Sequence, residues 1–300
     1  MSLCVLGSGS GGNCSALALS RKGRRRPDVT LIDCGLSIKQ TAKRMEAVGL
    51  KLGDVKQVLV THFDSDHFKQ VWIRRAEQRD WRIRFHINHW HLANRAGAPE
   101  VEHEPFDDDG PFELEDGCVV YPIRLDHDTN GTVGYRVEAG GRRLGFATDL
   151  GRVPDRLLDE FANIDLLALE SNYCPQMQMD SPRPVYLKRR IMGGRGHLSN
   201  QESLEAVKLI ADQSERLERI VLLHLSRQCN SPGKILSLYA QFPELSRKLV
   251  LSNQDRPTEW VHLKCEGNGT GRAGGRPVAT GRKAAPVIEA ERAQLGLWEG

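Results

Sequence analysis

Residues 61–67 read Thr-His-Phe-Asp-Ser-Asp-His, so two histidines and two aspartates stand within six consecutive positions. They directly follow Val-Leu-Val, a run that is typical of a buried β-strand. Side chains packed this tightly repel one another and lose hydration, and a divalent cation offsets both costs. The alternative is a polar surface turn. If the segment binds a cation, the fold must bring further ligands to this strand end.

Other predicted strands end in side chains that can serve as those further ligands. They are His127 after residues 119–125, Asp149 after residues 144–147 and His224 after residues 220–223. Strand ends converge at one edge of a sheet, where α/β folds place their sites. We therefore expect these three side chains to meet His62 in one metal site.

Short apolar runs alternate with amphipathic stretches over most of the sequence. Further strands are predicted at residues 3–6, 16–19, 29–32, 58–60, 83–85, 133–137 and 166–169. Helices are predicted at residues 37–48, 199–211 and 232–239, the second opened by a capping box of Ser199 and Glu202. Strand-rich halves with flanking helices predict a layered α/β protein with two sheets inside.

With 39% hydrophobic and 27% charged residues, the composition is typical of a soluble globular protein. No apolar run reaches the ~18 residues that span a bilayer, and the N-terminus lacks the features of a signal peptide. Seven cysteines without a Cys-x-x-Cys pair indicate reduced thiols and predict a cytoplasmic location. We expect a globular catalytic domain over residues 1–265 and a flexible Gly/Arg/Ala-rich tail over residues 266–300.

A net charge of +3 gives no overall signature of nucleic-acid binding. Residues 21–26, however, hold five positive charges in six positions. This segment is either a solvated hairpin end or a contact to a phosphate backbone.

Two other patterns carry less weight. Residues 7–12 satisfy Gly-x-Gly-x-x-Gly, but the sequence that follows predicts no helix, which argues against a dinucleotide site. Residues 86–91 hold three histidines. We interpret them as surface or supporting residues rather than as a second metal site.

The segment 62–67 resembles the His-x-His-x-Asp-His signature of the metallo-β-lactamase superfamily, with Asp64 in place of the second histidine. Four other stretches resemble its remaining motifs: Leu31-Ile-Asp33-Cys-Gly35, His127-Asp128, Ala147-Thr-Asp149-Leu-Gly and Leu223-His224-Leu-Ser226. Residues 7–13, 170–172 and 196–200 are similar to its exonuclease-like YycJ/WalJ-type branch. The resemblance covers residues 2–253 and implies a four-layer αββα sandwich, in which helices flank two mixed sheets.

The resemblance also implies a site with two divalent metal ions, which would be zinc, manganese or iron. One ion would be held by His62, Asp64 and His127, and the other by Asp66, His67 and His224, with Asp149 bridging both. A hydroxide between the metals would be the nucleophile. Asp66 and His197 would be catalytic, and Asn172, Ser199 and Asn200 would contact the substrate.

These features predict a binuclear metal-dependent hydrolase, specifically a phosphodiesterase or nuclease that acts on nucleic acid. One alternative uses the same site on a small molecule such as a cyclic phosphodiester, lactone or thioester. A second is a non-hydrolytic metal-binding or di-iron protein, because Asp64 brings a harder oxygen ligand that favours manganese or iron over zinc. The identity of the metal and the oligomeric state are left open.

Overall fold

The computed structural model describes residues 1–20, 23–96, 103–107, 110–114 and 116–264. The predicted tail at residues 266–300 therefore lies outside the described residues. Within the described part, the strands form two seven-stranded sheets that lie face to face. No described helix has the length and apolar character needed to cross a membrane.

The first sheet joins an antiparallel N-terminal hairpin to a parallel half. Its order is β14-β1-β2-β3-β4-β5-β6. The strands are β1 (Ser2–Gly7), β2 (Cys14–Leu19), β3 (Asp28–Ile32), β4 (Val55–Leu59), β5 (Arg82–His86), β6 (His103–Phe106) and β14 (Val261–His262). The pairs from β3 to β6 are parallel, and those between β14 and β3 are antiparallel.

The second sheet repeats this combination, with the order β13-β12-β11-β10-β9-β8-β7. Its strands are β7 (Phe112–Glu113), β8 (Val119–Leu125), β9 (Thr132–Ala139), β10 (Arg142–Ala147), β11 (Leu166–Glu170), β12 (Arg219–Leu223) and β13 (Leu249–Leu251). The pairs from β10 to β13 are parallel, and those from β7 to β10 are antiparallel.

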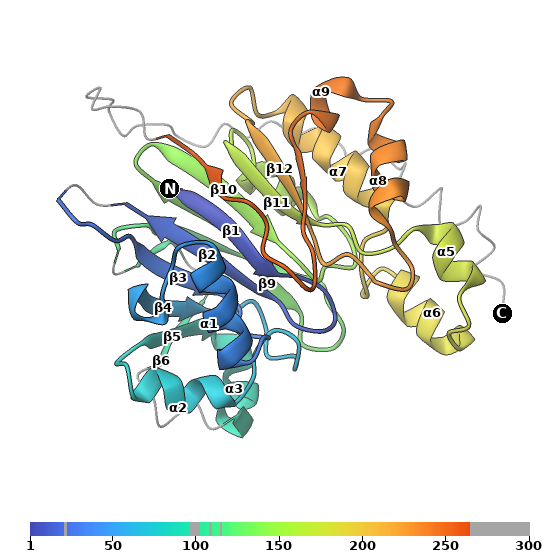
Figure 1. Ribbon diagram of the computed structural model, residues 1–300. Coiled ribbons are helices and arrows are strands. Elements are labelled where there is room, and N and C mark those ends of the chain that lie inside the picture. The colour runs from blue at the N-terminus through green and yellow to red at the C-terminus, as the bar shows by residue number, and fades with distance from the viewer. Residues whose placement is uncertain (21–22, 97–102, 108–109, 115, 265–300) are drawn as a thin grey trace.

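Helices cover the outer face of each sheet, so the molecule has four layers (Figure 1). The first sheet carries α1 (Ile38–Ala47), the short turns η1 (Leu52–Asp54) and η2 (Ile87–His89), α2 (Val71–Glu77) and α3 (Trp90–Ala96). The second carries α4 (Asp155–Glu160), α7 (Asn200–Asp212), α8 (Pro232–Tyr239) and α9 (Pro243–Ser246). Two further helices, α5 (Pro175–Asp180) and α6 (Val185–Met192), project to one side. The expected αββα arrangement is confirmed.

The alternation of side chains along β1 shows how one strand serves two layers. Leu3 and Val5 pack in the cluster between the sheets, whereas Cys4 and Leu6 pack in the cluster beneath α1 and α2. Successive side chains of a strand point to opposite faces, so a strand buried on both faces must be apolar at nearly every position. This continuous apolar run is the reason that the strand at residues 3–6 could be predicted from the sequence.

The structure shows the surroundings of the two weaker sequence patterns, the glycine-rich stretch and the histidines of residues 86–91. The glycine-rich residues 8–13 lead from β1 directly into β2, so they open no helix and the argument against a dinucleotide site is confirmed. His86 and His89 are buried, so of the two alternatives only the supporting one fits them, whereas His91 is exposed. Among the described residues, no potential metal-ligand group includes either of them.

Backbone hydrogen bonds attach the motif 61–67 to the loops after β1 and β3. The amide of Cys34 donates to the carbonyl of His67 over 2.7 Å, and the amide of Asn13 donates to that of Asp66, also over 2.7 Å. A Cβ at Gly35 would lie 1.7 Å from the Asp66 carbonyl oxygen. This close approach requires glycine.

We expect Gly35→Ala to lower the free energy of unfolding by about 1–3 kcal/mol, because the added methyl group forces the motif away from its support. Gly53→Ala is the matched control, since no atom lies within 4 Å of a Cβ built there. It should change stability by less than about 0.5 kcal/mol. Urea denaturation measures both, and equal midpoints would contradict this account of the loop.

Candidate metal centre

The structure brings all seven residues predicted as ligands to one edge of the two sheets. Six of them form two groups of three, in each of which the possible ligand atoms lie within 4.8 Å of one another. The groups are His62, Asp64 and His127, and Asp66, His67 and His224. Each contains two imidazoles and one carboxylate. Each also takes residues from the loop after β4 and one residue that follows a strand of the second sheet.

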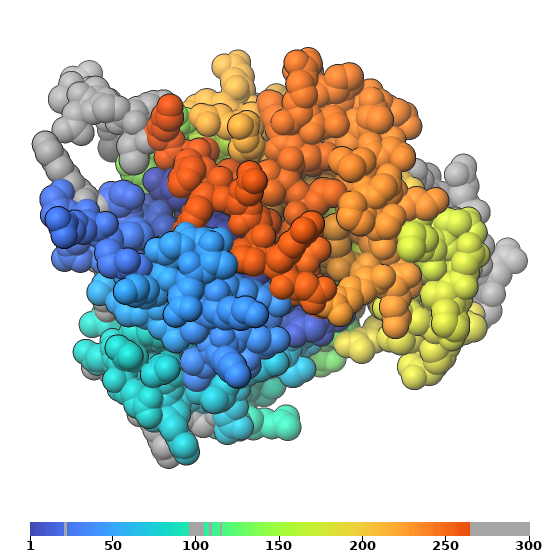
Figure 2. Space-filling model, in the orientation of Figure 1, coloured from blue at the N-terminus to red at the C-terminus, as the bar shows by residue number. Residues whose placement is uncertain are grey.

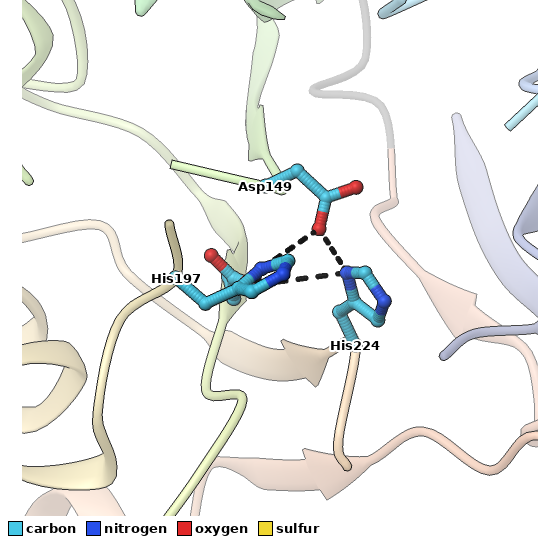
Figure 3. A group of neighbouring side chains, drawn as sticks. Asp149, His197 and His224 are labelled. Atoms are coloured by element: carbon cyan, nitrogen blue, oxygen red, sulfur yellow. Dashed lines mark hydrogen bonds and ion pairs between the residues drawn. The ribbon is translucent and has the colours of Figure 1, made fainter. Parts of the chain in front are cut away.

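Asp149 lies between the two groups. Its Oδ2 is 3.6 Å from His62 Nε2 and pairs with His67 Nε2, while its Oδ1 pairs with His224 Nδ1. Figure 3 shows this carboxylate directed at His224 and His197. Asp149 therefore occupies the position expected of a bridging ligand.

Hydrogen bonds through Nδ1 orient His62 and His127 so that Nε2 of each ring remains available. His127 Nδ1 donates to the Gly196 carbonyl over 2.9 Å. His62 Nδ1 lies 3.0 Å from the hydroxyl of Thr61. Among the described residues, the buried His62 Nε2 has no hydrogen-bond partner. A buried nitrogen without a partner is costly, and a metal ion at this position would satisfy it.

His67 is held in the same way by a carboxylate. Its Nδ1 donates to Asp33 Oδ2 over 2.8 Å, and Asp33 also accepts hydrogen bonds from the amide and hydroxyl of Thr61. A carboxylate behind an imidazole fixes its orientation and raises its basicity toward a metal. These donor sets fit two divalent cations.

The charges of the site explain the pKa shifts. Burial, together with the neighbouring imidazoles, lowers the pKa of His62 well below its usual value. Burial would also lower the pKa of His67, but the carboxylates of Asp149 and Asp33 raise it well above its usual value. Burial would raise the pKa of Asp149, but His224 and His67 hold it well below its usual value.

Asp64 and Asp66 are the more accessible members of their groups, with side chains 49% and 24% exposed. Asp64 Oδ2 lies 3.9 Å from His62 Nε2. Asp66 Oδ2 lies 3.8 Å from Nε2 of both His67 and His224. A cavity opens at this edge of the sheets, and Asp64 and Asp66 both line it. Asp64 occupies the place that the second histidine of the signature would take.

Three of the residues that build the site have left-handed backbone conformations. The φ angles of Asp33, Asp149 and His224 are 62°, 51° and 53°. Each residue lies within two positions of the end of a strand, and the left-handed turn takes its side chain out of the alternation of that strand. Non-glycine residues in this region cost free energy, and such strain collects at functional sites.

Glu170, to which the sequence analysis gave no role, is the fully buried last residue of β11. Its Oε1 accepts a hydrogen bond from His197 Nδ1 over 2.7 Å, and its Oε2 accepts from the amides of Leu150 and Leu198. Burial would lower the pKa of His197, but Glu170 and Asp149 raise it to about 10. Two signals in the sequence pointed to Glu170: it is a charged residue at the end of an apolar run, and it opens the stretch 170–172 that resembles the exonuclease-like branch.

The three predicted substrate contacts separate in the structure. Asn172 lines the cavity beside the candidate ligands. Ser199 does not, because its hydroxyl caps α7 by accepting from the Glu202 amide. The side chain of Asn200 is likewise buried, in hydrogen bonds with Ser171 and Asn230. The structure thus places Ser199 and Asn200 beside the cavity rather than in its wall.

The predicted basic segment lies far from the cavity. β2 leaves the site at Cys14, and a strand of its length carries the chain about 20 Å away before β3 returns. Figure 1 shows this hairpin end on the side opposite α6. Arg24 pairs with Asp28 and Arg26 with Asp54, whereas residues 21 and 22 lie outside the described part. The described part of the segment therefore fits a solvated hairpin end better than a contact to a substrate in the cavity.

Comparisons with known proteins agree with this arrangement. The family described as the beta-lactamase superfamily domain matches residues 29–225. Exodeoxyribonuclease YycJ of Bacillus anthracis is 28% identical over 228 residues, which cover 75% of this chain and 83% of the relative. Exodeoxyribonuclease WalJ of Streptococcus pneumoniae is 26% identical over 234 residues, which cover 75% and 82%.

Two solved structures share the fold at low sequence identity. Zn²⁺-bound PqqB from Methylobacterium extorquens aligns with a TM-score of 0.65 at 18% identity, over 88% of this chain and 100% of the other. The short form of human tRNase Z aligns with a TM-score of 0.56 at 18% identity, over 89% of this chain and 100% of the other.

We expect Asp33→Asn to weaken metal binding about 10–100-fold, because the amide no longer fixes His67 as a carboxylate does. The control is Asp116→Asn, which alters a buried carboxylate bonded to Thr30 and Cys118 instead of to the site. Competition against a chromophoric chelator gives both affinities. Equal affinities for the two variants would contradict this role of Asp33.

Proposed function

This chain belongs to the beta-lactamase superfamily, and we propose that it is a binuclear metal-dependent phosphodiesterase that hydrolyses nucleic acid. The observation that carries the proposal is the pair of three-residue groups around Asp149, with His197 beside them in one cavity. The similarity to two exodeoxyribonucleases supports nucleic acid as the substrate.

The seven candidate ligands divide between two cations. His62, Asp64 and His127 would hold one, Asp66, His67 and His224 would hold the other, and Asp149 lies between the two groups. Bound there, the cations would lower the pKa of a water molecule and polarise the phosphoryl oxygens of the substrate. The protein fixes the imidazoles through Asp33, Thr61 and Gly196, so little reorganisation is needed when substrate binds.

His197 and Asp66 are the residues we assign to proton transfer. Glu170 fixes Nδ1 of His197, which leaves Nε2 as the ring nitrogen that can reach a substrate oxygen. Protonated His197 then donates the proton on Nε2 to the leaving oxygen as the phosphodiester bond breaks. Asp66 is accessible from the cavity and accepts a proton from the attacking water.

Arginines in the cavity wall favour a phosphodiester over a lactone or thioester. Arg183 and Arg190 both line the cavity, and guanidinium groups match the geometry of phosphate oxygens. A small cyclic phosphodiester remains the second candidate substrate. The di-iron alternative rests on Asp64 alone.

We expect the purified protein, loaded with Mn²⁺ or Zn²⁺, to degrade end-labelled DNA or RNA. Chelation should abolish the activity and metal addition should restore it. Asp149→Ala should reduce it by at least about 100-fold, because losing a shared ligand costs more than losing a supporting residue. Cleavage of small esters with no cleavage of nucleic acid would favour the second candidate. Full activity of Asp149→Ala would contradict the binuclear site.

The role of Glu170 can be separated from a structural one by changing the leaving group. Glu170→Gln should slow DNA hydrolysis about 100-fold, because His197 loses the carboxylate that orients it. Hydrolysis of bis(p-nitrophenyl) phosphate should fall by less than about 5-fold, because p-nitrophenolate leaves without protonation. Glu205→Gln, on the surface of α7, is the control. An equal loss on both substrates would indicate a structural role.

A further inference from the structure

The pair α5 and α6, inserted between β11 and α7, forms one wall of the cavity and was not foreseen from the sequence. Figures 1 and 2 show it projecting from the body of the molecule. Four residues of this wall face the cavity: Arg183, Leu187, Arg190 and Ile191. Leu187, Arg190 and Ile191 lie three and four residues apart and so share one face of α6, whereas Arg183 lies just before the helix.

Beside this face, α6 exposes large apolar side chains to solvent. Tyr186 is 75% exposed; Val185 is 65% exposed but stands two positions before Leu187, so it lies on the side of α6 away from the cavity. Tyr186 precedes the cavity-lining Leu187 and stands one helical turn before Arg190, so it lies on the flank of α6 nearest the cavity. Exposed apolar groups beside a polar cleft mark a binding surface.

The same segment carries much of the positive charge of the protein. Residues 174–197 contain five basic residues and one acidic residue, whereas the net charge of the whole chain is +3. Arg190 pairs with Asp128. Within the described part of the chain, Arg183 donates to the amide oxygens of Gln178 and Gln228, which leave its charge uncompensated.

An uncompensated guanidinium in the cavity wall and an exposed aromatic ring beside it match the two parts of a nucleotide. The guanidinium suits the phosphate, and the ring suits the face of a base. Paired bases inside a duplex present only their edges, so stacking on a side chain requires an unpaired base.

Building on the proposed function, we propose that α5 and α6 bind single-stranded nucleic acid, with Arg183 on a backbone phosphate and Tyr186 stacked on an unpaired base. This surface takes the role that the sequence had suggested for residues 21–26. If α5 and α6 bind in this way, the substrate of the metal centre is a nucleic-acid strand whose bases are unpaired at the cavity.

Binding of a fluorescent single-stranded DNA with phosphorothioate linkages, which resist hydrolysis, tests the stacking. By anisotropy with the full metal-loaded chain, Tyr186→Ala should bind at least about 10-fold more weakly, whereas Tyr186→Phe should stay within about 3-fold of the wild type. Val185→Ala, at the neighbouring exposed residue, is the matched control and should bind like the wild type. A blunt duplex of the same sequence should bind more weakly than the single strand.

Abasic nucleotides placed at successive positions locate the stacked base. One position should weaken wild-type binding about as much as Tyr186→Ala does, and the variant should be insensitive to that same abasic nucleotide. Tyr186→Ala binding within about 2-fold of the wild type overturns the proposal, as does a Tyr186→Phe variant as weak as Tyr186→Ala. If the wild type binds no nucleic acid and cleaves none, it is the proposed function that fails.

Salt dependence tests Arg183 separately. Arg183→Gln should reduce the slope of log affinity against log salt by about 0.7, the value for one phosphate contact on a single strand. Arg24→Gln removes an equal charge at the distant hairpin end and should leave the slope unchanged. Equal slopes for both variants would show that Arg183 contacts no phosphate.

Discussion

The burial of the Asp149 carboxylate among imidazoles constrains how the two sheets meet. Asp149 is almost completely removed from water, and an ionised carboxylate is stable there only when positive or hydrogen-bonding groups surround it. Those groups come from the loop after β4, the segment before α7 and the end of β12. The two sheets must therefore meet at this edge. The left-handed backbone at Asp149 and His224 is part of the cost of turning both side chains toward each other.

The sequence predicted what depends on local pattern. The seven candidate ligands lie in the segments that follow β4, β8, β10 and β12, and short strands followed by His and Asp can be recognised without knowing the fold. Glu170 was not identified as a site residue because its hydrogen-bond partner, His197, is 27 residues away in the sequence. The capping box of Ser199 and Glu202 was predicted from the local sequence and is confirmed, because it depends only on residues three positions apart. The sequence left two alternatives open for residues 21–26, because the pairing with Asp28 and Asp54 and the distance from the cavity depend on the three-dimensional structure.

The aspartate at position 64 makes the two halves of the centre alike. A histidine there would leave one group with three imidazoles and the other with two imidazoles and a carboxylate. With Asp64, both groups have the same donor set, and they differ instead in accessibility. Mixed nitrogen and oxygen donors suit zinc, manganese and iron, so selection among these metals depends on geometry and supply more than on donor type.

Each candidate ligand group takes members from both sheets, and this has a thermodynamic consequence. His62 and Asp64 follow β4 of the first sheet, while His127 follows β8 of the second; the other group divides in the same way. A cation bound to either group would cross-link the two halves of the sandwich, much as a disulfide joins distant parts of a chain. Because an ion that binds only the folded state stabilises it by mass action, the resistance of the sandwich to unfolding would depend on the supply of metal.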